Sequence, residues 1–86
     1  MHEAGVTRRL VEVVVERAEA AGAKRVRGVH LEIGEESDVS PVSVDFYWRD
    51  AARGTPAEGA QLHFKPVSDD PLACRVVAID VDDELP

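Results

Sequence analysis

The sequence predicts a two-layer α/β (α+β) protein, in which two helices lie on one face of a three-stranded mixed sheet in the order α-β-α-β-β. Three observations predict this fold. The chain has 86 residues, so residues 1–86 are expected to form a single domain. Two segments have helical spacing with start or stop signals. Three further segments alternate apolar and polar residues, which is typical of strands with one face in water.

The first helix is expected from Val6 to Ala21. Its apolar residues fall near helical spacing, and charged residues fill the opposite side. The apolar set is Val6, Leu10, Val13, Val14 and Ala21, and the charged set is Glu12, Glu16, Arg17 and Glu19. Gly22 should end this helix, because glycine readily adopts the left-handed conformation found at helix ends.

The stretch VRGVHLEIG, residues 26–34, predicts the first strand. Its inward positions are Val29, Leu31 and Ile33, and its outward positions are Gly28, His30 and Glu32. The next stretch, DVSPVSVDFYWRDAARG, is ambiguous because Val42, Val44, Phe46 and Trp48 have a period of two. We predict a helix here, since Ser40 and Pro41 form a good N-cap and first position, and Gly54 is a good stop.

The stretches QLHFKPV, residues 61–67, and RVVAIDVD, residues 75–82, predict the second and third strands. In the second strand the inward positions are Leu62 and Phe64, and the outward ones are Gln61, His63 and Lys65. In the third strand the expected inward positions are Val77, Ile79 and Val81, and the outward ones are Ala78, Asp80 and Asp82. A right-handed crossover should join the first two strands, and an antiparallel hairpin should add the last.

Composition excludes several classes of partner. Seventeen acidic and ten basic residues give a net charge of −7, which opposes binding to nucleic acid or anionic lipid. The start carries no basic region followed by a long apolar run, and no stretch approaches the roughly 20 apolar residues of a membrane span. The single cysteine, Cys74, fits a reducing compartment and is best interpreted as a small inert residue beside a strand. We therefore expect a cytoplasmic protein.

No catalytic or cofactor-binding residues are expected, so the chain should not be an enzyme. The acidic runs lie in loops or the tail, without a cleft to perturb them, and are best interpreted as solubilising charge. These runs are Glu35-Glu36, Asp69-Asp70 and Asp82-Asp83-Glu84. Ser37, Ser40 and Ser43 lack a glycine-rich elbow, and no phosphate-binding glycine loop is present.

The outer face of the predicted sheet carries further candidate ligands. His30 and His63 point outward, and Glu32, Asp80 and Asp82 share that face if the strands are neighbours. A surface metal site could form there, although a solvated face with ordinary surface histidines is the favoured interpretation.

The aromatic run Phe46, Tyr47 and Trp48 is the strongest binding feature away from the terminus. Trp48 is expected to pack under the sheet, because a small core needs large side chains. An exposed aromatic would instead indicate a docking patch. The edges of the sheet could also pair with a second copy of the chain, forming a homodimer.

The start of the chain, MHE, places a terminal amine, a backbone amide and an imidazole within one short loop that can close around one metal ion. Together with GAKRVRGVHLEIGE, GTPAEGAQLHFKPV and VVAIDVD, in that order, it resembles the HypA/HybF family. This family consists of nickel metallochaperones for [NiFe]-hydrogenases and, in some organisms, urease. The resemblance implies that Ni(II) is held by the Met1 amine, the His2 amide nitrogen and imidazole, and the backbone amide or carboxylate of Glu3.

The chemistry of these groups is favourable, because Ni(II) accepts square-planar nitrogen ligation and the terminal amine, with a pKa of about 8, is freed more readily than a lysine amine. The alternative for His2 is an exposed histidine that binds nothing. The alternative for Glu3 is an acid favoured by the helix dipole.

One departure from the family concerns zinc. Family members usually carry a module with two Cys-x-x-Cys pairs before the last strand, whereas this chain passes from HFKPV through SDDPLAC to VVAIDVD. One thiolate cannot replace four, so no structural zinc is expected. The resemblance implies a nickel-handling GTPase and the hydrogenase large subunit as partners. The competing hypothesis is a zinc-less paralogue that acts as an interaction or regulatory module without metal transfer.

Overall fold

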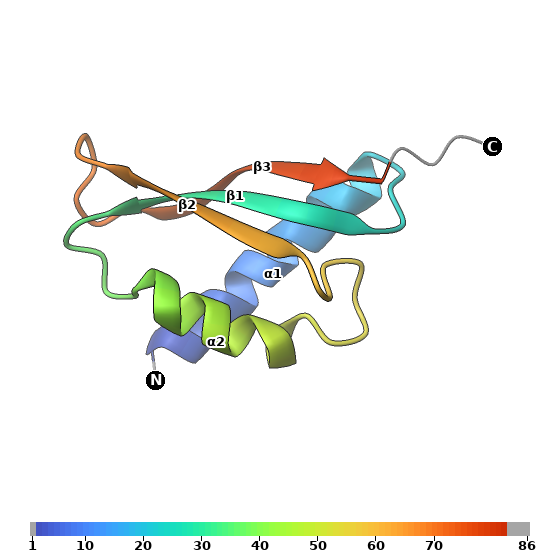
Figure 1. Ribbon diagram of the computed structural model, residues 1–86, viewed down its shortest axis with the longest axis horizontal. Coiled ribbons are helices and arrows are strands. Elements are labelled where there is room, and N and C mark those ends of the chain that lie inside the picture. The colour runs from blue at the N-terminus through green and yellow to red at the C-terminus, as the bar shows by residue number, and fades with distance from the viewer. Residues whose placement is uncertain (1, 83–86) are drawn as a thin grey trace.

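The computed structural model describes residues 2–82 and contains the five expected elements (Figure 1). In chain order these are α1 (His2–Ala20), β1 (Val26–Gly34), α2 (Pro41–Ala51), β2 (Gln61–Val67) and β3 (Cys74–Val81). Both helices lie on one face of the sheet, so the predicted two-layer α+β fold is confirmed. Within residues 2–82 neither helix is long and apolar enough to cross a membrane.

Helix α1 begins at His2, four residues before the predicted start at Val6. Gly5 does not interrupt it, because this glycine lies on the exposed side of the helix, where its intrinsic cost is only about 1 kcal/mol. The buried face also differs from the prediction, since it includes Val11 and Ala18, whereas Ala21 is exposed beyond the helix end.

The end of α1 is a Schellman motif centred on Gly22, as the sequence indicated. Gly22 has a φ of 69°, a conformation that costs glycine little because it has no Cβ. Its N–H donates to the Glu19 carbonyl over 3.0 Å, and the Ala23 N–H donates to the Ala18 carbonyl over 2.9 Å. The chain can therefore turn at once toward β1.

Helix α2 resolves the ambiguous aromatic stretch. The Ser40 hydroxyl accepts from the Ser43 N–H over 3.1 Å, and Pro41 takes the first helical position. Helical geometry divides the period-two pattern into two stripes spaced four residues apart. Val44 and Trp48 are buried, whereas Val42 and Phe46 are 80% and 73% exposed.

The sheet has the strand order β2-β1-β3, with β1 parallel to β2 and antiparallel to β3. The expected hairpin between the second and third strands is therefore wrong. The loop after β2 passes the end of β1 and is hydrogen-bonded to it. The Glu36 N–H donates to the Pro71 carbonyl over 2.7 Å, and the Gly34 N–H donates to the Ala73 carbonyl over 2.9 Å. This placement gives the apolar strand β1 the fully paired central position.

The start of β3 differs from the prediction because the strand contains a β-bulge. His30 pairs with Ala78 and the next residue, Leu31, pairs with Val76, so Val77 is an extra residue without a partner. Val76 is consequently buried, while the predicted core residue Val77 is 45% exposed. Ile79 faces the core and Ala78 and Asp80 face outward, as predicted. Val81 lies beyond a second register shift and is 37% exposed. Simple alternation fails because one added residue reverses the face.

The core lies between the sheet and the two helices, and it contains Trp48 as predicted. Trp48 is 3% exposed, and its indole N–H donates to the Ala57 carbonyl over 3.1 Å. This bond satisfies the one polar atom of the side chain in an apolar setting. It also ties α2 to the loop that leads into β2.

Candidate functional site

The predicted nickel site lies at the edge of the described part of the chain. Met1 and the side chain of His2 lie outside the described residues, whereas the backbone of His2 and all of Glu3 lie within them. Both backbone positions belong to the first turn of α1.

The first turn of a helix has a chemical property that suits a metal chelate. The first N–H groups of an α-helix have no carbonyl four residues earlier to accept from them. Because α1 begins at His2, the amides of His2 and Glu3 hold no helical hydrogen bond of this kind. An amide nitrogen must lose its proton to bind a metal, and an existing hydrogen bond would oppose that loss.

Glu3 is anchored to the core through Thr7, a residue that the sequence analysis did not single out. The Thr7 hydroxyl donates to the Glu3 carbonyl over 2.7 Å, and Thr7 itself is 0% exposed. This bond holds the start of α1 against the core. A threonine at the apolar spacing of this helix, four residues after Glu3, was the available sequence signal.

Glu3 also borders an open hollow of about 450 Å³ between the start of α1, the end of β1 and the start of α2. Two other carboxylates, Glu35 and Asp38, line the same hollow. Three acidic side chains around one opening produce a negative potential, which raises the local concentration of cations. Glu35, predicted as solubilising charge, thus lines the same hollow as Glu3, one of the predicted metal ligands.

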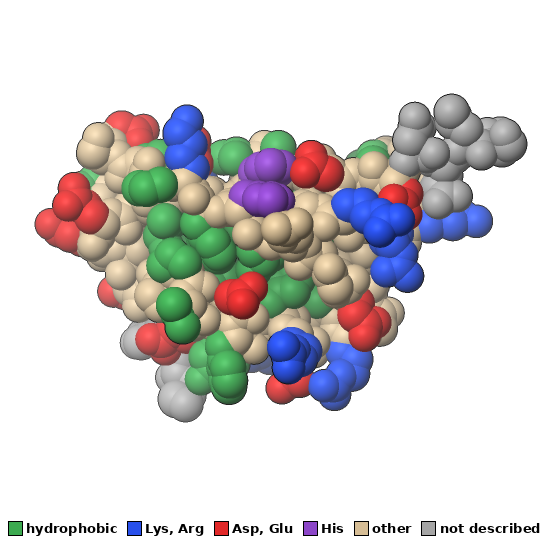
Figure 2. All heavy atoms as spheres, in the orientation of Figure 1, with side chains coloured by type: hydrophobic (Ala, Val, Ile, Leu, Met, Phe, Trp, Pro, Cys, Tyr) green, Lys and Arg blue, Asp and Glu red, His purple; other side chains and the backbone are tan. Residues whose placement is uncertain are grey.

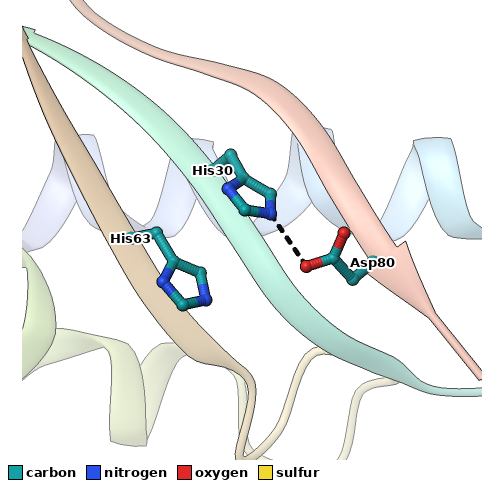
Figure 3. Close-up of side chains that lie close together, drawn as sticks. All are labelled: His30, His63 and Asp80. Carbon is teal, nitrogen blue, oxygen red and sulfur yellow. Dashed lines mark hydrogen bonds and ion pairs between the residues drawn. The ribbon is translucent and has the colours of Figure 1, made fainter.

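A second group of candidate ligands lies on the outer face of the sheet, where His30, His63 and Asp80 meet (Figure 3). His30 Nε2 is 2.8 Å from Asp80 Oδ2, and the two imidazole rings are stacked with centroids 4.8 Å apart. The predicted outward orientation of both histidines is confirmed.

The other acids expected on that face have cationic partners instead. Arg75 donates to Glu32 over 2.6 Å and also lies 3.4 Å from Asp70, and the hydrogen bond to Glu32 raises the pKa of the Arg75 guanidinium. Arg27 donates to Asp82, which is half-buried beyond the end of β3.

Cys74 lies at the first position of β3 and is half-buried. Burial raises the pKa of the Cys74 thiol, because the thiolate is poorly solvated there. A thiol with a raised pKa is a weak nucleophile and a weak metal ligand at neutral pH. This agrees with the prediction of an inert cysteine.

Comparison with known proteins identifies the class as nickel metallochaperones. The family that matches residues 1–80 is described as "Hydrogenase/urease nickel incorporation, metallochaperone, hypA". Hydrogenase maturation factor HypA of Klebsiella pneumoniae subsp. pneumoniae is 41% identical over 63 residues, covering 73% of this chain and 55% of the relative. HypA of Caldanaerobacter subterraneus subsp. tengcongensis is 45% identical over 67 residues, covering 78% and 59%. Hydrogenase maturation factor HybF of Salmonella typhimurium is 43% identical over 63 residues, covering 73% and 56%.

Because the match extends over residues 1–80, the chain belongs to the HypA family, and the resemblance seen in its four sequence segments is confirmed. The family consists of maturation metallochaperones and not of enzymes. The aligned part of this chain spans 55 to 59% of the length of these relatives.

Proposed function

We propose that this chain captures Ni(II) through Met1, His2 and Glu3 and passes it on during maturation of a [NiFe]-hydrogenase or a urease. The observation that carries the proposal is the start of α1 at His2 in a chain of the HypA family. The helix leaves the amides of residues 2 and 3 without helical acceptors, next to a terminal amine and an imidazole.

The ligand set suits Ni(II) for two reasons. Amine, amide and imidazole nitrogens that follow one another along the chain form adjacent chelate rings, and Ni(II) accepts four nitrogen ligands in a plane. Glu3 adds either its backbone amide or its carboxylate. The nearby carboxylates of Glu35 and Asp38 attract the ion without needing to bind it directly.

Selectivity for nickel needs a source other than affinity. Cu(II) prefers similar ligands and lies above nickel in the affinity order, so this ligand set alone would favour copper. Metal supply and the partner protein must therefore select the ion. The proposed partners are a nickel-handling GTPase and the hydrogenase large subunit, and the free edges of β2 and β3 offer positions where a second copy could pair.

Two further parts of the proposal rest on cysteine content. The chain has one cysteine in its 86 residues, which cannot form a four-thiolate zinc site, so these residues are proposed to hold no structural zinc of that kind. A lone cysteine also forms no disulfide within the chain, which supports a reducing compartment such as the cytoplasm.

Calorimetric titration of Ni(II) into protein with a free Met1 amine tests the proposed chelate. The comparison samples carry extra residues before Met1 or the substitution His2→Ala, and Glu16→Ala, exposed on the same helix, is the matched control. The expected result is a saturable site with the absorption band of square-planar Ni(II), which both changes at the terminus remove and Glu16→Ala keeps. Equal nickel binding in the extended and native proteins would contradict the terminal site.

A second candidate function, an interaction module without metal transfer, is favoured by the exposed stripe on α2. Val42 and Phe46 lie one helical turn apart and are 80% and 73% exposed, as expected for a docking patch. Under this hypothesis His2→Ala leaves partner binding unchanged and Phe46→Ala weakens it. Loss of nickel transfer in His2→Ala, with partner binding intact, would favour the chaperone function.

A further inference from the structure

The outer face of the sheet carries a ligand cluster that the terminal nickel site does not use. We propose that His30, His63 and Asp80 form a second binding site, for a divalent transition-metal ion such as Zn(II). Each residue comes from a different strand, and the three side chains converge above the centre of the sheet (Figure 3). The helices and the start of α1 lie on the other face (Figure 1), so the two sites share no residue.

The register of the sheet explains why these side chains meet. His30 and His63 are direct partners in the parallel pair β1–β2, so their side chains are nearest neighbours on the same face. On the other side of β1, Asp80 of β3 is the partner of Gly28, and Ala78 is the partner of His30. Gly28 and His30 lie on the same face of β1, so Asp80 points to that face, as alternation predicted. The register of the sheet thus places a carboxylate beside the two imidazoles.

The distances fit a metal site that needs only small side-chain movements to close. His30 Nε2 and Asp80 Oδ2 are 2.8 Å apart, and ligand atoms of all three residues lie within 4.8 Å of one another. Zinc binds nitrogen and oxygen at about 2.0–2.2 Å, which separates tetrahedral ligand atoms by roughly 3.3 Å. Closing the site would require the His63 ring to leave its stacked position.

Gly28 provides a second, independent observation. A Cβ at position 28 would lie 2.8 Å from Asp80 Oδ2 and 3.5 Å from His63 Nε2. Ligand atoms from two edge strands therefore lie above the same glycine of the central strand. Any larger residue would occupy the space in which the carboxylate and the imidazole approach each other.

The chemistry and surroundings of the cluster also suit a cation. Imidazole is a ligand that Zn, Ni and Cu prefer. Zn(II) also binds Asp carboxylates, and three protein ligands leave a further position for water. The side chains of His30 and Asp80 are 40% and 58% exposed, so an ion can reach them. Histidine side chains (purple) lie together at this surface of the molecule (Figure 2).

Neighbouring charges do not block the site. On this face the acids Glu32 and Asp82 are paired with Arg75 and Arg27 respectively. The carboxylate of Asp80 has His30 as its partner. A bound ion would replace the hydrogen bond between these two groups.

Zinc titration of the full chain carrying His2→Ala tests the proposal, because this substitution removes the terminal imidazole and leaves two of the three histidines. Proton–nitrogen NMR of the imidazoles should show one equivalent of Zn(II) shifting both His30 and His63. Adding His63→Ala or Asp80→Asn should lower the affinity at least about tenfold. Gln61→Ala, exposed on the same strand and face, is the matched control and should have no effect.

Gly28→Ala tests the geometry without removing a ligand. The added Cβ meets the flexible end of Asp80, so the protein should stay folded, as circular dichroism would show, while zinc affinity falls. The proposal is overturned if the His2→Ala protein shows no saturable zinc binding, or if His63→Ala and Gln61→Ala bind zinc equally well. Neither result bears on the proposed terminal nickel site, because His2→Ala removes the imidazole of that site from these samples.

Discussion

The start of α1 and the outer face of the sheet offer metal ions two different kinds of site. At the start of α1 the proposed ligands are three consecutive residues, and main-chain atoms supply most of them. On the sheet the proposed ligands are side chains from three strands, and residues His30 and Asp80 are 50 positions apart in the chain. The first site depends on local chain chemistry, whereas the second depends on the register of the whole sheet.

This difference predicts separate responses to unfolding. A chelate of adjacent residues keeps its ligands close even in an unfolded chain, as loop closure over so few residues costs little entropy. The sheet cluster exists only while β1, β2 and β3 are paired. Substitutions can therefore separate the two sites.

Leu31→Ala should have the largest effect. Leu31 lies in the central strand and is 1% exposed, so truncation should lower the free energy of unfolding by about 2–5 kcal/mol, measured by urea denaturation. Zinc binding at the sheet should weaken as the folded fraction falls, while nickel binding at the terminus persists. Val77→Ala, at an exposed position of β3, is the control and should change stability by less than about 0.5 kcal/mol. Nickel binding that disappears together with the sheet would show that the terminal site needs the fold.

Ser40→Ala should have a smaller effect, confined to α2. It removes the side chain that accepts from the Ser43 N–H, and loss of such a cap costs about 0.5–2 kcal/mol. Thermal unfolding measures this change. Because Ser40 is remote from the outer face of the sheet, the folded Ser40→Ala protein should bind zinc with unchanged affinity. Weaker zinc binding by the folded variant would contradict the separation of the two regions.

Thr7→Val should affect the terminal site more than the sheet. The substitution keeps the volume but removes the 2.7 Å bond to the Glu3 carbonyl, at a cost of about 0.5–1.5 kcal/mol. A looser first turn should lower nickel affinity by roughly two- to fivefold, measured by calorimetry, and leave zinc binding unchanged. Unaltered nickel affinity would mean that the helix start plays no part in the chelate.

Cys74 should give the smallest effect. Its raised pKa predicts slower alkylation by iodoacetamide at pH 8 than in urea-unfolded protein. Since the folded state holds this proton more tightly, the contribution to stability is complete below the unfolded pKa, about 8.5, and is lost as pH rises through the folded pKa. Equal alkylation rates in folded and unfolded protein would contradict this.

Most elements of the fold could be predicted because their signals are local. Gly22 ends α1 and Ser40 caps α2 through hydrogen bonds to backbone groups only a few residues away. The alternation in β1 arises because one face of the strand is buried against the helices. The start of α1 was misplaced because the apolar spacing begins only at Val6, and the buried Thr7, whose hydroxyl bonds the Glu3 carbonyl one turn earlier, was not used as a signal.

The strand order and the bulge in β3 could not be predicted, since they depend on pairing between distant segments. Val76 and Val77 are the same residue type, so nothing local distinguishes the buried one from the bulged one. Dependence on distant segments also limited the prediction of the sheet cluster. The outward direction of His30 and His63 followed from alternation, but the meeting with Asp80 required β3 to lie beside β1. The terminal ligands Met1, His2 and Glu3 stay a prediction from family resemblance.

The buried indole of Trp48 provides an intrinsic fluorescence probe of folding. It is the single tryptophan of the chain, and unfolding would expose it to water and break its bond to Ala57, shifting its emission to longer wavelength. Folding can therefore be followed without any label. Because the indole belongs to the helical layer, an emission change on adding zinc would report a rearranged interior and not contact with an ion on the opposite side of the sheet.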